Sequence, residues 1–202
     1  MSRIFLATRN RGKLAEMRRI LADVVPGVDV LGLDDVDDYD EPAETEPTFA
    51  GNALLKARAA VRATGLVCLA DDSGLCVDAL NGMPGVLSAR WSGSGKDDAA
   101  NNRLLLQQLH DVPDERRGAE FRCAVALCRP DGGEDVTEGR MPGRIIRELR
   151  GDGGFGYDVV FVPAGQSRTS AEMSAADKDA VSHRGQAVRA IVARVAEVLT
   201  AS

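Results

Sequence analysis

The sequence lacks several features that would assign it to large classes of proteins. Aromatic residues make up only 4% of the 202 residues, so Ala, Val and Leu have to build most of the core. No apolar run approaches the ~20 residues that a membrane-spanning helix needs. No long apolar stretch or cleavage site follows Met1, so we expect no secretory signal. These absences favour a globular cytoplasmic protein without a membrane anchor.

Positive charge is also scarce. The chain holds 25 Lys and Arg against 31 Asp and Glu, which gives a net charge of −6. Such a balance argues against a protein that binds nucleic acid or an anionic membrane through its overall field. It leaves room for a local basic pocket, because the segment 34–46 is acidic and contains no Lys or Arg, while the rest of the chain is slightly basic.

Cysteine is present without the spacing that a metal site requires. The chain contains no C-x2-C pair, and no His lies near any of its four cysteines, which are Cys68, Cys76, Cys123 and Cys128. We interpret them as small buried residues of a protein in a reducing compartment.

Alternating strand and helix patterns predict an α/β fold with a mixed sheet. Helices are expected from Gly12, from Thr48 to Gly65, before Pro113 and over 187–199. A buried strand is expected at 3–8, and further strands are expected at 28–33, 66–70, 75–77, 121–127, 136–141, 144–147 and 159–162. The strand-rich region near 119–147 suggests a second lobe of the same domain. Ligands in such folds bind at the carboxyl ends of strands.

The segment Thr8-Arg9-Asn10-Arg11-Gly12-Lys13 joins the first expected strand to the first helix. A hydroxyl, an amide, a glycine and an ammonium meet here at a helix N-terminus, where backbone N–H groups are unpaired, and this arrangement suits phosphate oxygens. It is not a P-loop, because Ala7 and Leu14 stand where that motif needs Gly and Ser or Thr. The alternative is a capped turn with a surface lysine.

Two adjacent carboxylates, Asp71 and Asp72, follow the apolar run 66–70 and precede Ser73 and Gly74. One carboxylate can hold a hard cation such as Mg2+ and one can take a proton from water. The alternative is an Asp-Asp-Ser-Gly turn. Of the acidic segment 34–46, most carboxylates are expected to be solvated, with one of Glu44 and Glu46 able to reach the same cation.

Two further segments carry polar and aromatic groups. Residues 151–156 match G-x-G-x-x-G, but a strand pattern and no helix follows, so we exclude a dinucleotide fingerprint. A flexible loop with Phe155, Tyr157 and Asp158 suits a planar ligand, and a glycine-rich hairpin turn is the alternative. Lys178, His183 and Arg184 form a group of hydrogen-bond donors near the start of the last helix, and no nucleophile elbow accompanies them.

Five segments in order resemble the inosine triphosphate pyrophosphatase family. They are ATRNRGK (7–13), TFAGNALLKA (48–57), ADDSGLCVDALNGMPGVLSARW (70–91), GGFGYD (153–158) and SHRGQA (182–187). The resemblance implies an elongated α/β fold with two lobes around a long mixed central sheet flanked by helices. It also implies one domain over 1–202, a homodimer, and Mg2+-dependent hydrolysis of ITP, dITP and XTP to the monophosphate and pyrophosphate.

The resemblance also implies roles for individual residues. The triphosphate would be bound by the segment that comprises Thr8, Arg9, Asn10, Arg11, Gly12 and Lys13. Asp72 would be general base and metal ligand, with Glu44 as second ligand and Glu46 as its alternative. Ser73 would contact the substrate. The base and sugar would be framed by Phe155, Gly156, Tyr157, Asp158, Lys178, His183 and Arg184.

Three positions depart from the family pattern. Gly51 stands where an acid is frequent, Glu46-Pro47 where a glycine is usual, and Val159 where a proline usually follows Gly-Tyr-Asp. Donor-only groups at the base edge favour a 6-oxo purine, because a 6-amino group would leave buried donors unpaired at a cost of ~1–3 kcal/mol each.

Two other functions compete with this one. One is a hydrolase for a modified pyrimidine triphosphate, and the other is a regulatory module that binds a nucleotide without turnover. The Asp71-Asp72 pair argues against the regulatory module, because binding alone needs no water-activating base.

Overall fold

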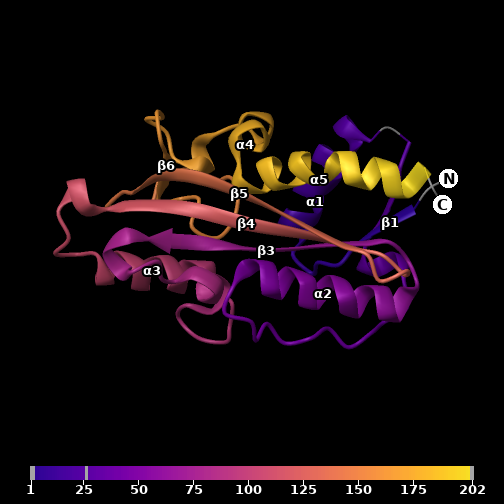
Figure 1. Cartoon of the computed structure of the whole chain (residues 1–202). Coiled ribbons are helices and arrows are strands. Elements are labelled where there is room, and N and C mark those ends of the chain that lie inside the picture. Colours follow the sequence, from indigo (N-terminus) through magenta and orange to yellow (C-terminus); the bar gives the residue numbers. More distant parts are fainter. Residues whose placement is uncertain (1–2, 26, 201–202) are drawn as a thin grey trace. The chain divides into compact units, whose positions relative to one another are not determined.

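Six strands form one mixed sheet in the order β2-β1-β3-β4-β5-β6. The computed structural model describes residues 3–25 and 27–200. The strands are β1 (Arg3–Leu6), β2 (Asp29–Leu31), β3 (Cys68–Val77), β4 (Gly118–Cys128), β5 (Glu134–Ile145) and β6 (Phe161–Pro163). β1 pairs in parallel with β2 and β3, whereas β5 and β6 are antiparallel. This sheet, with helices between its strands in the chain (Figure 1), confirms the predicted α/β class.

The chain divides into two compact units that share the long strands. The first unit holds residues 1–72, 123–139 and 184–202, and the second holds 73–122 and 140–183. The α-helices are α1 (Arg11–Val24), α2 (Phe49–Thr64), α3 (Asp98–Gln108), α4 (Ala175–Val181) and α5 (His183–Thr200). Within the described part of the chain, no helix is long and apolar enough to cross a membrane.

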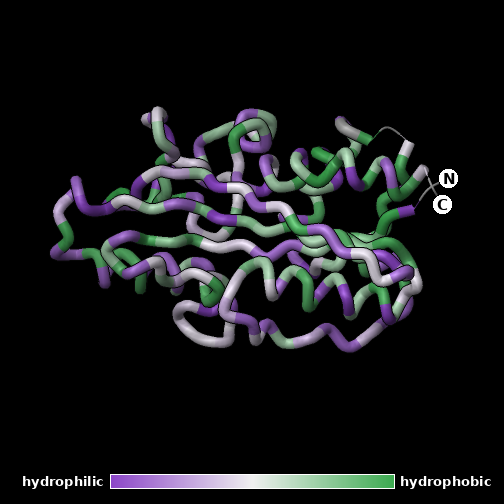
Figure 2. The backbone as a smooth tube through the Cα atoms, in the orientation of Figure 1, coloured by the Kyte–Doolittle hydropathy of each residue, from purple (hydrophilic) through white to green (hydrophobic). Residues whose placement is uncertain are grey.

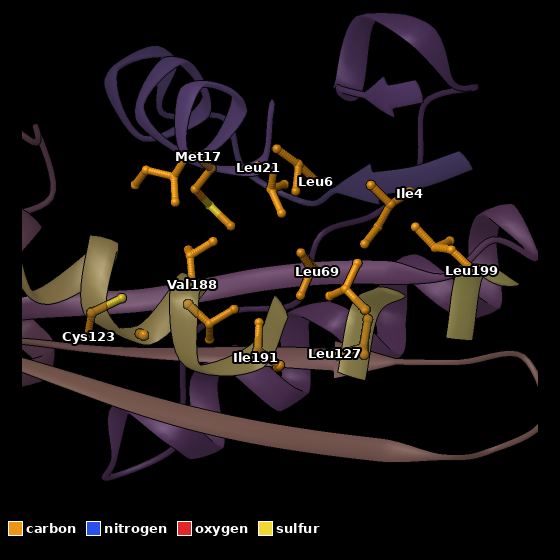
Figure 3. Packing of buried hydrophobic residues seen from close by; sticks show 14 residues of the cluster. Ile4, Leu6, Met17, Leu21, Leu69, Cys123, Leu127, Val188, Ile191 and Leu199 are labelled. Atoms are coloured by element: carbon orange, nitrogen blue, oxygen red, sulfur yellow. The ribbon is translucent and has the colours of Figure 1, made fainter. Parts of the chain in front are cut away.

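In the first unit, strand alternation produces two separate hydrophobic layers. Ile4 and Leu6 of β1 pack with α1 and α5 on one face, and Phe5 packs with α2 on the other (Figure 1). Figure 3 shows Met17, Leu21 and Val188 among the side chains of the α1 and α5 layer. The α2 layer is built from small residues, which are Ala53, Ala57, Ala60, Ala70, Ala124 and Ala126. Small side chains let this helix lie close to the sheet.

The ends of α2 match their sequence signals. Thr48 Oγ1 accepts a hydrogen bond from Gly51 N at 3.0 Å, which caps the first turn. Gly65 ends the helix in the left-handed conformation with φ 68°. Both boundaries confirm the predicted helix. The four cysteines are free and buried, as predicted.

In the second unit, one cluster packs α3 against the strands. Leu105 of α3 and Leu109, the residue that follows the helix, are fully buried with Leu75 of β3. The rings of Phe121 and Phe161 meet edge to face at a centroid distance of 4.7 Å. The leucine contacts fix the C-terminal end of α3 within the unit.

Several predicted boundaries were wrong. β3 runs without a turn from Cys68 to Val77, so Asp71 and Asp72 lie inside a strand rather than after it. They interrupt the apolar residues of β3. In Figure 2 the strands of the sheet carry both hydrophobic and hydrophilic positions. Cations from other elements neutralise these two carboxylates, so β3 continues without a break across Asp71 and Asp72. β5 is likewise continuous over Glu134–Ile145, where two strands were expected.

The segment after the glycine-rich loop also differs from the prediction. Residues 156–160 form a turn, and β6 begins only at Phe161. No helix follows the G-x-G-x-x-G match, so its exclusion as a dinucleotide motif is confirmed. The short helix α4, which carries Lys178, was not predicted, because its seven residues are too few for a periodic pattern.

Close packing at Gly74 gives a first prediction. A Cβ atom there would lie 2.3 Å from Gly85 O and 2.4 Å from Ser88 Oγ. We expect Gly74→Ala to lower the free energy of unfolding by about 1–3 kcal/mol through overpacking, measured by urea denaturation. Gly95→Ala is the control, because its Cβ would meet nothing within 4 Å. Equal stability of the two variants would contradict the prediction.

Candidate active site

The turn from β1 to α1 is held by its own side chains. Asn10 Oδ1 accepts from Lys13 N at 3.1 Å and so caps α1, and Thr8 Oγ1 accepts from Asn10 N at 3.3 Å. Arg9 forms an ion pair with Glu41, with 3.1 Å between Nε and Oε1. The backbone N–H groups of the first turn, at Arg11 and Gly12, have no partner within a helix. The turn therefore presents donors at a helix N-terminus, where an anion is stabilised.

Asp71 sits between two cations inside the first unit. Its Oδ2 atom lies 3.0 Å from Lys13 Nζ and 3.2 Å from Arg184 Nε. Arg184 also donates through Nη1 to Glu16, and the side chains of Arg184 and Asp71 are 1% and 0% exposed. Burial alone would raise the pKa of Asp71, but the charges of Lys13 and Arg184 outweigh it and hold that pKa well below its usual value. Asp71 is therefore ionised and holds the Lys13 ammonium at the turn.

Asp72 faces the opposite side of β3, toward α2. Asn52 Nδ2 donates to Asp72 Oδ2 at 3.1 Å, and Lys56 Nζ lies 3.5 Å from Asp72 Oδ1. The same ammonium nitrogen is 3.0 Å from Glu44 Oε1. Asn52 Oδ1 accepts from Glu46 N at 2.9 Å, so the amide nitrogen has to face Asp72. Each oxygen of the Asp72 carboxylate thus has a different neighbour.

The surroundings of Asp72 raise the pKa of its carboxylate, which suits a group that accepts a proton. Burial raises the pKa of Asp72, and the nearby Glu44 charge adds to the increase, while Lys56 and Lys13 oppose it. The result is a pKa above the ordinary value of an aspartate, whereas that of the adjacent Asp71 is lowered. A carboxylate with a raised pKa is a better general base near neutral pH.

Glu44 rather than Glu46 lies with Asp72. Glu46 contacts Asn52 through its backbone, with its N–H donating at 2.9 Å and its carbonyl accepting at 3.3 Å, and the residue is exposed. A Cβ at Gly51 would lie 2.7 Å from Glu46 Cβ, so the glycine at this position makes room for Glu46. Of the two candidates that the sequence left open, Glu44 is the one whose carboxylate reaches the Asp72 side.

The oxygen donors fit a hard divalent cation. Glu44 and Asp72 converge on one cationic position, which the Lys56 ammonium occupies at 3.0 and 3.5 Å. Mg2+ is commonly held by one or two protein carboxylates together with water and substrate phosphates. Across residues 3–25 and 27–200 there is no group of three or more His, Cys, Asp or Glu that could hold a metal alone. The arrangement suits a cation that is bound jointly with a phosphate-bearing ligand.

The second unit places an aromatic ring beside an ion pair. Lys178 Nζ lies 2.5 Å from Asp158 Oδ2 and 5.0 Å from the centre of the Phe155 ring. Asp158 Oδ2 also accepts from Phe155 N at 2.9 Å. The hydroxyl of Tyr157 donates to Ser88 O at 2.9 Å, which anchors the loop in the core. Phe155 is half-buried, so part of its ring is accessible to a planar ligand.

His183 and Ser73 belong to the same unit. The imidazole of His183 stacks on Phe121, with ring centres 5.0 Å apart and planes at 11°. Ser73 follows Asp72 on β3 and is half-buried. The position of the His183 ring therefore depends on Phe121 of β4, and the position of Ser73 depends on β3.

The predicted residues fall into two groups, one in each unit. The turn residues 8–13, Glu44, Asp72 and Arg184 lie in the first unit, whereas Ser73, Phe155, Gly156, Tyr157, Asp158, Lys178 and His183 lie in the second. Arg184 was grouped with Lys178 as a donor for one ligand edge. The structure gives them different carboxylates, Glu16 and Asp71 for Arg184 and Asp158 for Lys178.

Three residues at the first group were missed from the sequence. Asn52 and Lys56 are four residues apart on α2 and so lie on one face, and Glu16 follows Lys13 by three residues on α1. In the sequence, the feature that could have indicated these residues was a polar residue on the apolar face of a predicted helix. The signal was weak because these spacings are equally common on solvated helices.

Comparisons with known proteins agree along nearly the whole chain. The model of the Ham1 family matches residues 4–194. The dITP/XTP pyrophosphatase of Nocardia farcinica is 61% identical over 197 residues, which cover 97% of this chain and 96% of the relative. That of Corynebacterium glutamicum strain R is 54% identical over 205 residues, which cover 99% and 100%.

Solved structures show the same relationship. The crystal structure of a nucleoside-triphosphatase / dITP/XTP pyrophosphatase from Mycobacterium abscessus has a TM-score of 0.77 at 58% identity, covering 94% of this chain and 98% of that one. The Staphylococcus aureus Ham1 protein has a TM-score of 0.84 at 37% identity, covering 96% and 98%.

The buried Asp71 gives a prediction for stability against pH. Its native pKa lies below the unfolded value, so its stabilisation is present above about pH 4 and is lost as the pH falls through the native pKa. We expect Asp71→Asn to lower the free energy of unfolding by about 3–5 kcal/mol at pH 7, measured in urea. The difference in the free energy of unfolding between Asp71→Asn and wild type should become smaller below about pH 4.

Asp23→Asn is the control for this experiment, because Asp23 lies exposed on α1. It should change stability by at most about 0.5 kcal/mol. A loss at Asp71 that stayed constant from pH 7 into the acid range would contradict the assignment of an ionised, stabilising carboxylate.

Proposed function

The chain belongs to the Ham1 family, and from this premise we propose that it hydrolyses dITP, XTP and ITP to the nucleoside monophosphate and pyrophosphate. The resemblance that its five motifs carry is confirmed, because relatives at 54% and 61% identity are named dITP/XTP pyrophosphatases. The chain spans 96% and 100% of the length of these relatives.

One observation carries the proposal. Two carboxylates, Glu44 and Asp72, meet at a single cationic position, and the Lys13 ammonium of the phosphate-binding turn is held by the adjacent Asp71. Cation, general base and phosphate donors are the components that phosphoanhydride hydrolysis requires. A module that only bound nucleotides would not need a base with a raised pKa.

The turn residues 8–13 would hold the triphosphate. First-turn N–H groups at Arg11 and Gly12 are aimed along the helix axis, and Lys13 and the exposed Arg11 add positive charge. Thr8 and Asn10 position the turn through their hydrogen bonds. When a phosphate approaches, Lys13 can exchange Asp71 for a phosphate oxygen, because Arg184 remains on the Asp71 carboxylate.

Glu44 and Asp72 would hold Mg2+ together with the substrate. When bound, the ion neutralises phosphate charge and lowers the pKa of a coordinated water. Lys56, which lies between the two carboxylates, would then be released toward the phosphates as a further positive charge.

Asp72 would accept the proton of the attacking water. The water oxygen forms a bond to phosphorus, the α–β phosphoanhydride breaks, and pyrophosphate leaves with the electron pair. Asn52 occupies Asp72 Oδ2 at 3.1 Å, which leaves Oδ1 as the oxygen that faces Lys56 and Glu44. Ser73, the next residue along β3, would contact the substrate.

The second unit would recognise the base. Phe155 offers a ring for stacking, and Tyr157 and Gly156 shape the loop around it. The Lys178 ammonium uses one N–H on Asp158, so two remain to donate to a 6-oxo group. His183 is stacked on Phe121, so the ligand does not need to order its ring. Arg184, which the sequence assigned to the same ligand edge, belongs to the first unit and is held there by Glu16 and Asp71.

Assembly and location complete the proposal. We expect a homodimer of single-domain chains, each domain covering 1–202 with two lobes, in the cytoplasm. The four free, buried cysteines are compatible with that location.

The proposed reaction is tested with a panel of substrates. We expect protein and Mg2+ to release pyrophosphate from dITP, XTP and ITP, and much less from ATP and CTP, whose bases carry an amino group in place of the oxo group; GTP, which has a 6-oxo group, is measured alongside. Product analysis would separate pyrophosphate from orthophosphate. Release of orthophosphate, or turnover confined to pyrimidine nucleotides, would contradict the proposal. Tight nucleotide binding with no turnover would favour a regulatory module instead.

Asp72→Asn tests the general base. The amide cannot accept the proton and carries no charge for the metal, so we expect kcat to fall by about 10²–10⁴-fold or more. Asp23→Asn, the same change at an exposed site on α1, is the control and should retain wild-type kcat. An Asp72→Asn enzyme with wild-type kcat would remove this residue from the reaction.

A further inference from the structure

The loop that carries Phe155 has little rigidity of its own. Glycines occupy four of its positions, 151, 153, 154 and 156, and Gly154 and Gly156 adopt positive φ values of 73° and 63°. Glycine loses more conformational freedom on ordering than any other residue. A ring that stacks on a nucleobase has to be held in one orientation, so contacts from outside the loop are required.

The first turns of α3 supply these contacts. Asp98 Oδ2 accepts from Gly156 N at 2.7 Å, and Asn102 Nδ2 donates to Gly156 O at 2.8 Å. Both polar groups of Gly156 are therefore bound by side chains one helical turn apart. Asn102 Nδ2 also donates to Asp98 O at 2.8 Å, which joins the two residues.

The orientation of the Asn102 amide is determined by its neighbours. Two carbonyl oxygens, of Asp98 and Gly156, face the side chain, so its nitrogen has to point toward them. Asn102 is 3% exposed, so solvent does not compete for these bonds. Asp98 lies in the first turn of α3, where a negative charge is favourable to the helix dipole.

The backbone on the N-terminal side of Phe155 is held by Asp158 instead of α3. Asp158 Oδ2 accepts from Phe155 N at 2.9 Å and pairs with Lys178, whose ammonium lies 5.0 Å from the ring centre. A Cβ at Gly154 would lie 2.1 Å from Asp158 Oδ2, so this loop residue has to be glycine. The backbone is thus bound on both sides of Phe155, by Asp158 before the ring and by α3 after it.

We propose that Asp98 and Asn102 are positioning residues for nucleobase recognition, which hold Phe155 in its stacking orientation through the backbone of Gly156. This inference rests on the proposed function and assigns part of its base specificity to α3. In this proposal both residues act through the backbone of Gly156 rather than through a contact with the substrate. Their effect should therefore appear in the binding of ligands that have a base and be absent for ligands that have only phosphates.

The helix itself does not depend on these contacts. α3 is anchored by Leu105 and Leu109 in the core and by Asn101, whose Oδ1 accepts from Ser92 N at 2.7 Å and whose Nδ2 donates to Ala89 O at 3.2 Å. Asn101 is the matched control for Asn102, because both are buried asparagines on one helix and only Asn102 reaches the loop.

The test compares ligands with and without a base. KM and kcat for dITP are measured for wild type, Asn102→Ala, Asp98→Ala and Asn101→Ala, together with the inhibition constant of inorganic tripolyphosphate as a base-free competitor. We expect Asn102→Ala and Asp98→Ala to raise KM for dITP about tenfold, as loss of about one hydrogen bond implies. The inhibition constant of tripolyphosphate should stay within about twofold of wild type.

Two further variants separate positioning from a general structural effect. Asp98→Asn keeps an acceptor for Gly156 N, so its KM for dITP should stay much closer to that of wild type than the KM of Asp98→Ala. On a Phe155→Leu background, Asn102→Ala should add no further increase in KM, because its effect passes through the ring. Asp98 is exposed, so its variants remain informative if Asn102→Ala does not fold.

The outcomes are distinct. Equal increases for dITP and tripolyphosphate, an effect of Asn101→Ala on KM as large as that of Asn102→Ala, or additive effects with Phe155→Leu would overturn the positioning role. A wild-type protein without activity on dITP would instead refute the proposed function. In that case binding of dITP and tripolyphosphate, measured by calorimetry on the same variants, still tests the positioning role.

Discussion

Side chains alternate between the two faces of a β-strand, and along β3 this alternation gives two adjacent carboxylates opposite surroundings. Asp71 points to the face of α1 and α5, where Lys13 and Arg184 neutralise it. Asp72 points to the face of α2, where Asn52 and Lys56 contact it. Burying an unpaired charge costs several kcal/mol, so each helix has to present its partner residue for the strand to fold. Three helices are thereby tied to two consecutive residues.

The same alternation separates two chemical tasks. The cations around Asp71 hold its pKa low, so it stays ionised and holds Lys13 at the turn. Burial and the nearby Glu44 raise the pKa of Asp72, which suits a residue that takes up a proton. In the proposed reaction one carboxylate would serve the phosphate turn and the other the reacting water, so neither would have to compromise its pKa for both tasks.

In the second unit, a flexible segment acquires its shape from its surroundings. The glycine-rich loop is held through backbone groups by Asp98, Asn102 and Asp158, and Tyr157 anchors it to Ser88. Glycine permits the positive φ values and the close approach of Asp158, and side chains of helix and loop then restore the order that glycine removes. The literal match to a dinucleotide motif has no structural counterpart.

Local patterns in the sequence were sufficient for the elements that short-range rules govern. The turn at 8–13, the α2 helix with its Thr48 cap and Gly65 end, and the C-terminal helix follow from capping and periodicity, and five ordered motifs identified the family. The continuity of β3, the position of Glu44 beside Lys56, and the contacts of Asn52, Lys56 and Glu16 did not follow. Each depends on a partner far away in the chain, such as Arg184 for Asp71, 113 residues apart. The sequence by itself therefore determined which chemical groups the protein carries, and only the tertiary structure decided which charge neutralises which, because ion pairing in a buried strand is a long-range contact.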